Sequence, residues 1–530
     1  MFFAFAGLRR RGVRSSSGAR AAVFAAGLLI AGAGSAAENI AVVGISADPG
    51  HFNPGITTGS HVHTVADSIF NGLVGLDQNL DPVPDLATSW EVSEDGKTVT
   101  FRLAEANWHD GAPFTSEDVK FSFEEVLFEH HSRTKAGLGD VVESIETPDP
   151  RTVVFKLAAP HPALLRRLDV TEAPILPKHV FEGAGDPNEA AANLAPVGTG
   201  PFRLASYMPN SEIVLERNPD YFKPGLPKLD RLVFRILADP TTMLLAYQQG
   251  ELDYMGGVQG QDVAALEAGG AEIVTSSSSP GGGNCIMTVS FNLKREATQN
   301  PGVREAFALA IDRDRIVEQV LFGQGKVATA PISSAIGWAH GDGALAAYGH
   351  DPEAAKAALD AAGFAPDADG TRLTLDMVHF PTFNRYAELM KQDLAAVGVE
   401  LVSRPLDREA TVETIFTQRD FDTNLISYCN GVDPEIGVKR MYVSSNIGPI
   451  PFSNAAAYRN GEIDRLFAEA GSVPGEDARG ALYKEAQGIL AEDLPYWWLV
   501  ETVSVAAYDD ALTGFKPWTG QFAEEAERTE

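Results

Sequence analysis

Residues 275–293 read TSSSSPGGGNCIMTVSFNL, a run of serine, proline and glycine that leads into an apolar segment. Clusters of these small residues are typical of connections between folded units, and the segment CIMTVSFNL is typical of a strand. The run lies near the middle of a chain of 530 residues, which is too long to form one hydrophobic core. The sequence therefore predicts two lobes, one before this connection and one after it.

Strand and helix patterns alternate along the chain. Residues 90–103, WEVSEDGKTVTFRL, contain two alternating runs around an Asp-Gly pair, which predicts a β-hairpin. Thr115 stands as an N-cap at the start of one helical pattern, and Pro301 and Pro352 each occupy the first position of another. This interleaving predicts an α/β fold.

The first 37 residues have the composition of a signal peptide. An arginine-rich start is followed by an apolar run, residues 21–34, and then by the small residues Ser35, Ala36 and Ala37. The apolar run is shorter than the roughly 20 residues that a membrane-spanning helix needs. We therefore expect residues 1–37 to be removed on export to the periplasm, so that the mature chain begins near Glu38.

The charge of the chain argues against two classes of partner. The formal net charge is −30, and removal of the arginine-rich start makes the mature chain more negative still. Such a surface is repelled by phosphate backbones and by anionic lipid headgroups. We therefore expect neither a nucleic-acid partner nor binding to a membrane surface.

The sequence contains no recognisable catalytic motif. The motifs GxSxG, HExxH and the P-loop are absent, and no GxGxxG opens a helix. His61 and His63 form an HxH pair, but two imidazoles without a third ligand do not make a metal site. We expect no cofactor and no catalytic residue, while contact of this pair with a metal chelate stays open. An exported hydrolase or metalloenzyme that uses these histidines is one alternative, and a sensor or chaperone subunit is another.

The chain has only two cysteines, Cys285 and Cys429, which stand far apart in the sequence. An exported protein matures in an oxidising compartment, where such a pair can form a disulfide. From the residues alone, one disulfide and two buried free thiols remain equally open.

Six segments occur in an order that is typical of one known family. They are residues 69–103, 108–124 (WHDGAPFTSEDVKFSFE), 196–204 (PVGTGPFRL), 215–222 (LERNPDYF), 250–254 (GELDY) and 303–317 (VREAFALAIDRDRIV). Through them the chain resembles, over about residues 53–515, the peptide/nickel class (family 5) of extracellular solute-binding proteins of ABC transporters. This class is related to dipeptide- and oligopeptide-binding proteins.

The resemblance implies a two-lobed periplasmic-binding-protein fold of the Venus-flytrap type, α/β in class, with an extra subdomain in the first lobe. We expect lobe I to comprise residues 38–284 and 504–530, and lobe II residues 285–503. The implied function is to capture a small peptide or peptide-like solute and to deliver it, by cleft closure, to an ABC permease in the inner membrane. A monomer is expected. The resemblance also favours a disulfide between Cys285 and Cys429.

The resemblance raises a question about the solute. In peptide binders an acidic residue that anchors the ligand's amino group lies in a W-x-x-D-x-x-[DE]-P segment. Residues 427–434, SYCNGVDP, match this segment with Asn430 in place of the Asp, and the position of a carboxylate-holding Arg falls near Met377. Both departures argue against a free zwitterionic dipeptide. A longer peptide held through its backbone, a modified peptide, a sugar-like solute and a metal chelate stay open.

The resemblance also indicates which segments face each other across the cleft. The expected ligand-binding residues are Gly59, Ser60, His61, His379, Phe380, Tyr428, Asn430 and Gly431. We expect Asn430 to be an unpaired side chain on a loop, where it hydrogen-bonds a neutral group of the ligand.

Overall fold

The computed structural model describes residues 39–276, 284–516 and 520–529. The expected signal peptide, residues 1–37, lies outside the described residues. From Asn39 onward the chain forms one compact unit. None of the described helices combines the length and the apolar character that are needed to cross a membrane.

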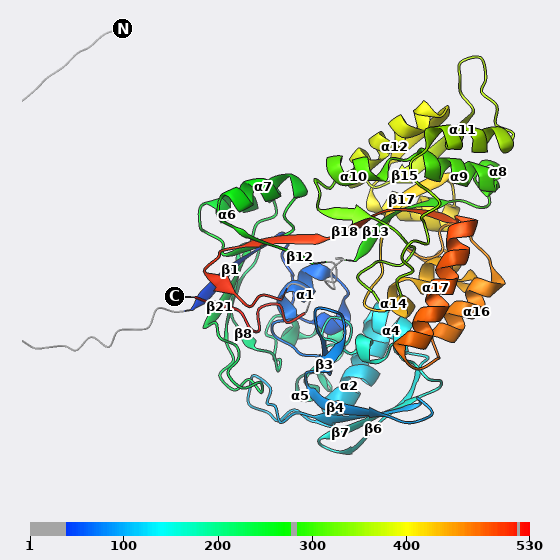
Figure 1. The fold of residues 1–530 in the computed structure, drawn as a ribbon. Coiled ribbons are helices and arrows are strands. Elements are labelled where there is room, and N and C mark those ends of the chain that lie inside the picture. The colour runs from blue at the N-terminus through cyan, green and yellow to red at the C-terminus, as the bar shows by residue number, and fades with distance from the viewer. Residues whose placement is uncertain (1–38, 277–283, 517–519, 530) are drawn as a thin grey trace, which may run out of the picture. The chain divides into compact units, whose positions relative to one another are not determined.

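A seven-stranded sheet forms the centre of the first lobe (Figure 1). Its strands, in spatial order, are β12 (Glu272–Ser276), β19 (Ser504–Tyr508), β11 (Tyr254–Gly256), β1 (Ile40–Ile45), β10 (Arg231–Ile236), β9 (Glu212–Arg217) and β8 (Phe202–Met208). Strand β1 is parallel to both of its neighbours, and the remaining pairs are antiparallel. The helices of this part of the lobe are α1 (Ser60–Ala66), α5 (Lys178–Phe181), α6 (Pro240–Gln248) and α7 (Gly260–Ala268).

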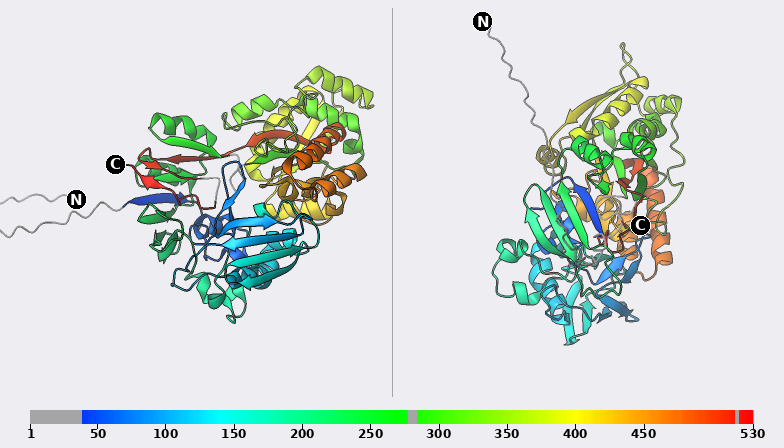
Figure 2. Two further views of the ribbon diagram at one scale, coloured as in Figure 1. Left: turned by 60° about the horizontal axis from the view of Figure 1, so that its bottom comes forward. Right: turned by 90° about the vertical axis from the view of Figure 1, so that its left-hand side faces the viewer.

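A second, four-stranded sheet makes a subdomain within the first lobe, drawn in blue and cyan in Figure 2. Its order is β4 (Ala87–Val92), β5 (Thr98–Leu103), β7 (Thr152–Leu157) and β6 (Val142–Asp149). Strands β4 and β5 are the two arms of the hairpin expected at residues 90–103. Helix α2 (Ser116–Phe121) starts at Thr115, whose side chain forms a capping box with Asp118. The helical path continues through η2 (Ser122–Leu127), α3 (Phe128–His130) and α4 (Ser132–Leu138).

The second lobe is built on a six-stranded sheet. Its order is β14 (Gly325–Val327), β18 (Tyr496–Thr502), β13 (Cys285–Phe291), β17 (Thr423–Cys429), β15 (Leu373–His379) and β16 (Val399–Pro405). All seven residues of β13 are buried, as expected for a central strand that is covered on both faces.

Helices cover both faces of this second sheet (Figure 1). On one side lie α9 (Pro301–Ala310), α11 (Pro352–Ala361) and α12 (Asn384–Ala396), and on the other α14 (Pro434–Gly437), α15 (Lys439–Tyr442), α16 (Gly461–Ala470) and α17 (Glu476–Asp493). The Phe291 ring of β13 lies 5.2 Å from Phe307 of α9, and the Trp498 ring of β18 lies 6.3 Å from Tyr442 of α15. Helices α9 and α11 have Pro at the first turn and an Asn or Asp cap, as expected.

The chain passes between the two large sheets twice. Strand β12 ends at Ser276 in the first sheet, and β13 begins at Cys285 in the second. Strand β18 ends at Thr502 in the second sheet, and β19 begins at Ser504 in the first, so only Val503 separates them. The last strands, β20 (Leu512–Thr513) and β21 (Glu527–Arg528), return to the first lobe, where Arg528 pairs with Asp253 at 2.6 Å.

Candidate functional site

The central strands of the second lobe, β13 and β17, meet at one edge of their sheet. Cys285 opens β13 and Cys429 ends β17, the two residues are opposite each other in the ladder, and a disulfide joins them. Asn430 and Gly431 follow directly. Helix α14 approaches this point so closely that a Cβ on Gly437 would lie 2.1 Å from the carbonyl of Asn430. The disulfide and this contact hold the edge of the sheet in place.

The Asn430 side chain is bonded within the protein, so the expectation of an unpaired amide is wrong. Asn430 is 1% exposed, and its Oδ1 accepts a hydrogen bond from the backbone N–H of Ser333 at 2.7 Å. Glu501 at the end of β18 holds the same segment, because its Oε2 accepts from the Ser334 hydroxyl at 2.7 Å. Asn430 therefore positions residues 333–334 at the edge of the second lobe.

Three other expected site residues of the second lobe are buried or half-buried. His379 is 0% exposed, and its ring nitrogens contact the carbonyl of Phe380 at 2.9 Å and the Ser403 hydroxyl at 2.7 Å. The buried Tyr428 ring packs edge-on against Tyr496 at 6.2 Å. Phe380 is half-buried. His379 and Tyr428 thus belong to the interior of the lobe.

The expected residues of the first lobe lie at the start of α1. Gly59 is the N-cap, and Ser60 and His61 are exposed. His63 is buried, with Nδ1 3.0 Å from Asp67 Oδ1 and Nε2 3.0 Å from the Thr57 carbonyl. Burial alone would lower the pKa of His63, but the Asp67 carboxylate outweighs it and the pKa is raised.

Both ring nitrogens of His63 therefore already have partners within the protein. His63 is thus not available to bind a metal together with His61. In the described ranges, no three side chains of His, Cys, Asp or Glu are grouped so that they could hold a metal ion.

A contact between the two lobes was not anticipated from the sequence. Arg166 of the subdomain, in the short helix η3 (Leu165–Arg167), places Nη2 2.6 Å from Glu476 Oε1 at the start of α17. The same nitrogen lies 2.8 Å from Asp81 in its own lobe, and Nη1 lies 3.8 Å from Asp433 Oδ2. The signal in the sequence is a pair of arginines in a largely apolar stretch, ALLRRLDV, residues 163–170. Buried arginines of this kind are seldom present without a partner.

Asp433 anchors the second-lobe side of this contact. It caps α14 and is fully buried, and Arg479 of α17 binds both of its oxygens at 2.6 and 2.8 Å. The Trp338 ring lies under both arginines, with its centroid 4.9 Å from the Arg479 guanidinium carbon and 5.8 Å from that of Arg166. The lobes thus meet through fixed ionic and aromatic groups.

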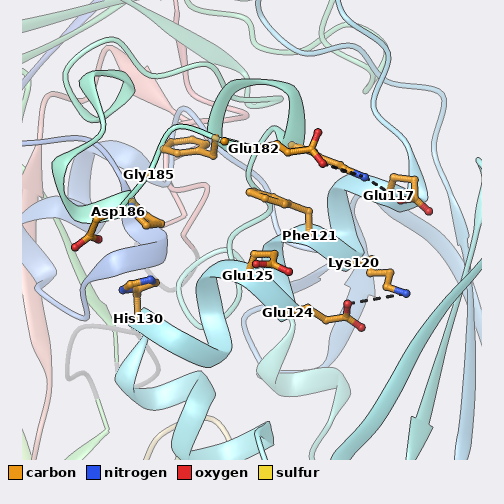
Figure 3. A pocket seen from close by; sticks show the side chains of 13 residues that line it. Glu117, Lys120, Phe121, Glu124, Glu125, His130, Glu182, Gly185 and Asp186 are labelled. Carbon is orange, nitrogen blue, oxygen red and sulfur yellow. Dashed lines mark hydrogen bonds and ion pairs between the residues drawn. The ribbon is translucent and has the colours of Figure 1, made fainter.

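A groove of about 700 Å³ on the subdomain has a different character (Figure 3). It lies between the helical path that begins at α2 and residues 178–187, and its lining includes Glu117, Glu124, Lys120 and Lys178. These charges pair with each other, Lys178 with Glu117 at 3.1 Å and Lys120 with Glu124 at 3.9 Å, and their side chains are 32–51% exposed. The groove is therefore a solvated surface feature and not part of the contact between the lobes.

Comparisons with known proteins agree with this architecture. Residues 81–448 match the model of bacterial extracellular solute-binding proteins, family 5. A putative ABC transporter peptide-binding protein of Brucella ovis is 31% identical over 94% of this chain and 95% of its own length. A glutathione-binding protein, GsiB, of Escherichia coli is 28% identical over 94% of this chain and 96% of its own length.

Among solved structures, the ABC transporter substrate-binding protein CtaP of Listeria monocytogenes superposes with a TM-score of 0.81 at 25% identity, covering 93% of this chain and all of that one. The two-lobed α/β fold is that of periplasmic binding proteins. The chain belongs to family 5 of the bacterial extracellular solute-binding proteins.

Proposed function

We propose that this chain is the substrate-binding component of an ABC importer, and that it captures a peptide or peptide-like solute between its lobes and delivers it to a membrane permease. The observation that carries the proposal is the connection between the lobes. Only Val503 separates β18 in one sheet from β19 in the other, while Arg166 and Glu476 meet across the lobes. A short hinge with ionic groups on the facing surfaces suits closure around a ligand, which stabilises the closed state by its differential affinity.

The class of solute follows from the relatives. Proteins that are similar over nearly the whole chain are named for binding peptides or glutathione, which is itself a peptide. Met377 is fully buried and the Asn430 amide is bonded to Ser333, so neither position offers a charge to the terminus of a dipeptide. The solute is therefore peptide-like, and its charged groups are met by other residues.

The setting of this function is the periplasm. The family is extracellular, and residues 1–37 have the pattern of a cleaved signal peptide. The mature protein acts as a monomer that meets its permease in the inner membrane. Gly59, Ser60 and His61 at the exposed start of α1, with Phe380 and Gly431 from the second lobe, contribute to the cleft around the solute.

The test is to isolate the protein from the periplasm and to identify by mass spectrometry what leaves it on denaturation. We expect peptides or modified peptides at close to one per chain. Release of a sugar or a metal chelate in place of a peptide would contradict the proposal. The N-terminus of the same sample should lie near Glu38.

A further inference from the structure

Arg167 is a buried arginine whose guanidinium forms no hydrogen bond within the part of the chain that the structure describes. Its residue is 8% exposed, and its Nε has no hydrogen-bond partner among the described residues. The guanidinium lies against helix α4, where a Cβ added to Gly137 would be 2.2 Å from Arg167 Nη1. The glycine thus leaves room for the arginine, which is held in place by shape and not by a counter-ion. A buried charge in this condition is costly unless something pairs with it.

The acidic groups around Arg167 each form an ion pair with another side chain. The carboxylates that act on it electrostatically are Glu172, Glu435 and Asp433. Each is paired with another basic side chain: Glu172 with Arg133 at 3.3 Å, Glu435 with Lys439 at 2.5 Å, and Asp433 with Arg479 at 2.6 Å. Because these partners already offset their charges, Arg167 retains its capacity to bind an additional anion.

Further polar atoms around Arg167 are also buried and have no hydrogen-bond partner within the described part of the chain. Among them are His161 Nε2 and Glu172 Oε2 from the first lobe and Glu435 Oε2 from the second. Burial, together with the charge of Arg167, lowers the pKa of His161 to about 4, so its ring is neutral at pH 7. Arg167, His161 and Glu435 thus present unused hydrogen-bonding atoms from both lobes, beside the contact that Arg166 makes with Glu476.

We propose that Arg167 binds a carboxylate of the solute when the lobes are closed. A guanidinium presents two parallel N–H groups that match the two oxygens of a carboxylate, and the resulting bonds are strong because both partners are charged. His161 and Glu435 flank the bound group and are available to its neighbouring N–H and C=O groups. The preferred solutes are peptides with a free carboxylate. Arg167 of the first lobe binds the negative charge of that carboxylate, and the residue at position 377 does not.

This inference rests on the proposed function, and the experiment separates the two. The probe is a casein digest, used either untreated or after methyl esterification, which converts each carboxylate into an uncharged ester. Immobilised mature protein is exposed to equal amounts of each digest, and the retained peptides are quantified by mass spectrometry. We expect the wild-type protein to retain untreated peptides about tenfold or more better than their esters, the loss that follows removal of a charge-assisted hydrogen bond.

Variants assign that preference to one residue. Arg167→Gln should retain both digests equally, and Gly137→Ala should weaken the preference because it displaces the guanidinium without changing its charge. Arg203→Gln is the matched control, since Arg203 lies in β8 and pairs with Glu216 at the surface. Thermal unfolding establishes that each variant is folded.

A preference that persists in folded Arg167→Gln would overturn the inference. Equal retention of both digests by the wild-type protein would also overturn it while leaving the proposed function intact. Retention of neither digest would overturn both.

Discussion

The Asn430 side chain joins two segments of the second lobe that are 97 residues apart in the sequence. We expect Asn430→Ala to lower the free energy of unfolding by about 1–3 kcal/mol, because the buried N–H of Ser333 loses its acceptor. Urea denaturation measures this. Asn79→Ala, at an exposed position of the first lobe, should have little effect. If both variants unfold alike, the structural role given to Asn430 is wrong.

Asp169 and His63 make the stability of the first lobe depend on pH. Burial, and then the neighbouring charges of Glu172 and Asp67, raise the pKa of Asp169 to about 7. An unfolded Asp titrates near 3.9, so between about pH 4 and pH 7 the folded state binds more protons than the unfolded state. The contribution of Asp169 to the free energy of unfolding therefore falls as the pH rises from about 4 to about 7.

His63 acts in the same direction at a higher pH. Because its folded pKa is raised, its contribution is present below about 6.5, the unfolded value, and is lost as the pH rises through the folded value. Asp169→Asn should remove the pH dependence of the free energy of unfolding between about pH 4 and pH 7. Urea denaturation at several pH values gives the difference between the wild type and the variant. A difference that is constant across the window would contradict the assignment to Asp169.

At the scale of the elements, the disulfide joins two neighbouring strands that enclose most of the second lobe's sequence. Cys285 and Cys429 are separated by 144 residues, so the bond restricts a long loop of the unfolded chain. Replacing both with Ala should lower the free energy of unfolding by about 2–5 kcal/mol. Chemical denaturation of the oxidised wild type and the double variant measures the loss. If the oxidised and reduced wild-type proteins unfold at the same denaturant concentration, the bond does not stabilise the lobe.

Elements with local signals could be predicted from the sequence. The hairpin at residues 90–103 follows from its Asp-Gly turn and its alternating runs, and the helices at Pro301 and Pro352 follow from their caps. The family and the two-lobed fold followed from longer segments in a typical order. In each case the deciding residues are close together in the chain.

The environment of the site residues could not be predicted in the same way. The sequence predicts that Asn430 faces the ligand, but its side-chain oxygen accepts a hydrogen bond from the backbone N–H of Ser333. His379 meets Ser403 on the neighbouring strand, which occupies its ring. The contact of Arg166 is not predictable from local sequence, because its partner Glu476 is 310 residues further along the chain. Side-chain partners are set by the three-dimensional packing, and a sequence pattern does not contain that information.

At the scale of the whole molecule, the Arg166–Glu476 pair contributes to closure. Glu476 is 43% exposed, so the pair is worth little by itself, and Glu476→Gln should weaken the binding of casein peptides by about twofold to fivefold. Glu469→Gln is the matched control, because Glu469 pairs with Arg465 within the second lobe. Calorimetric titration with a digest fraction that the wild-type protein retains measures the affinity of each variant for the peptides. Equal effects of the two substitutions would contradict a role for the contact in closure.

The central claim is that the two lobes close on a peptide. Small-angle X-ray scattering of the mature protein, with and without a casein digest, tests it directly, because closure about the Val503 connection makes the molecule more compact. We expect the radius of gyration to fall on addition of the digest and to stay constant on addition of a mixture of sugars. A radius that does not change with peptides, or that falls equally with sugars, would contradict the account.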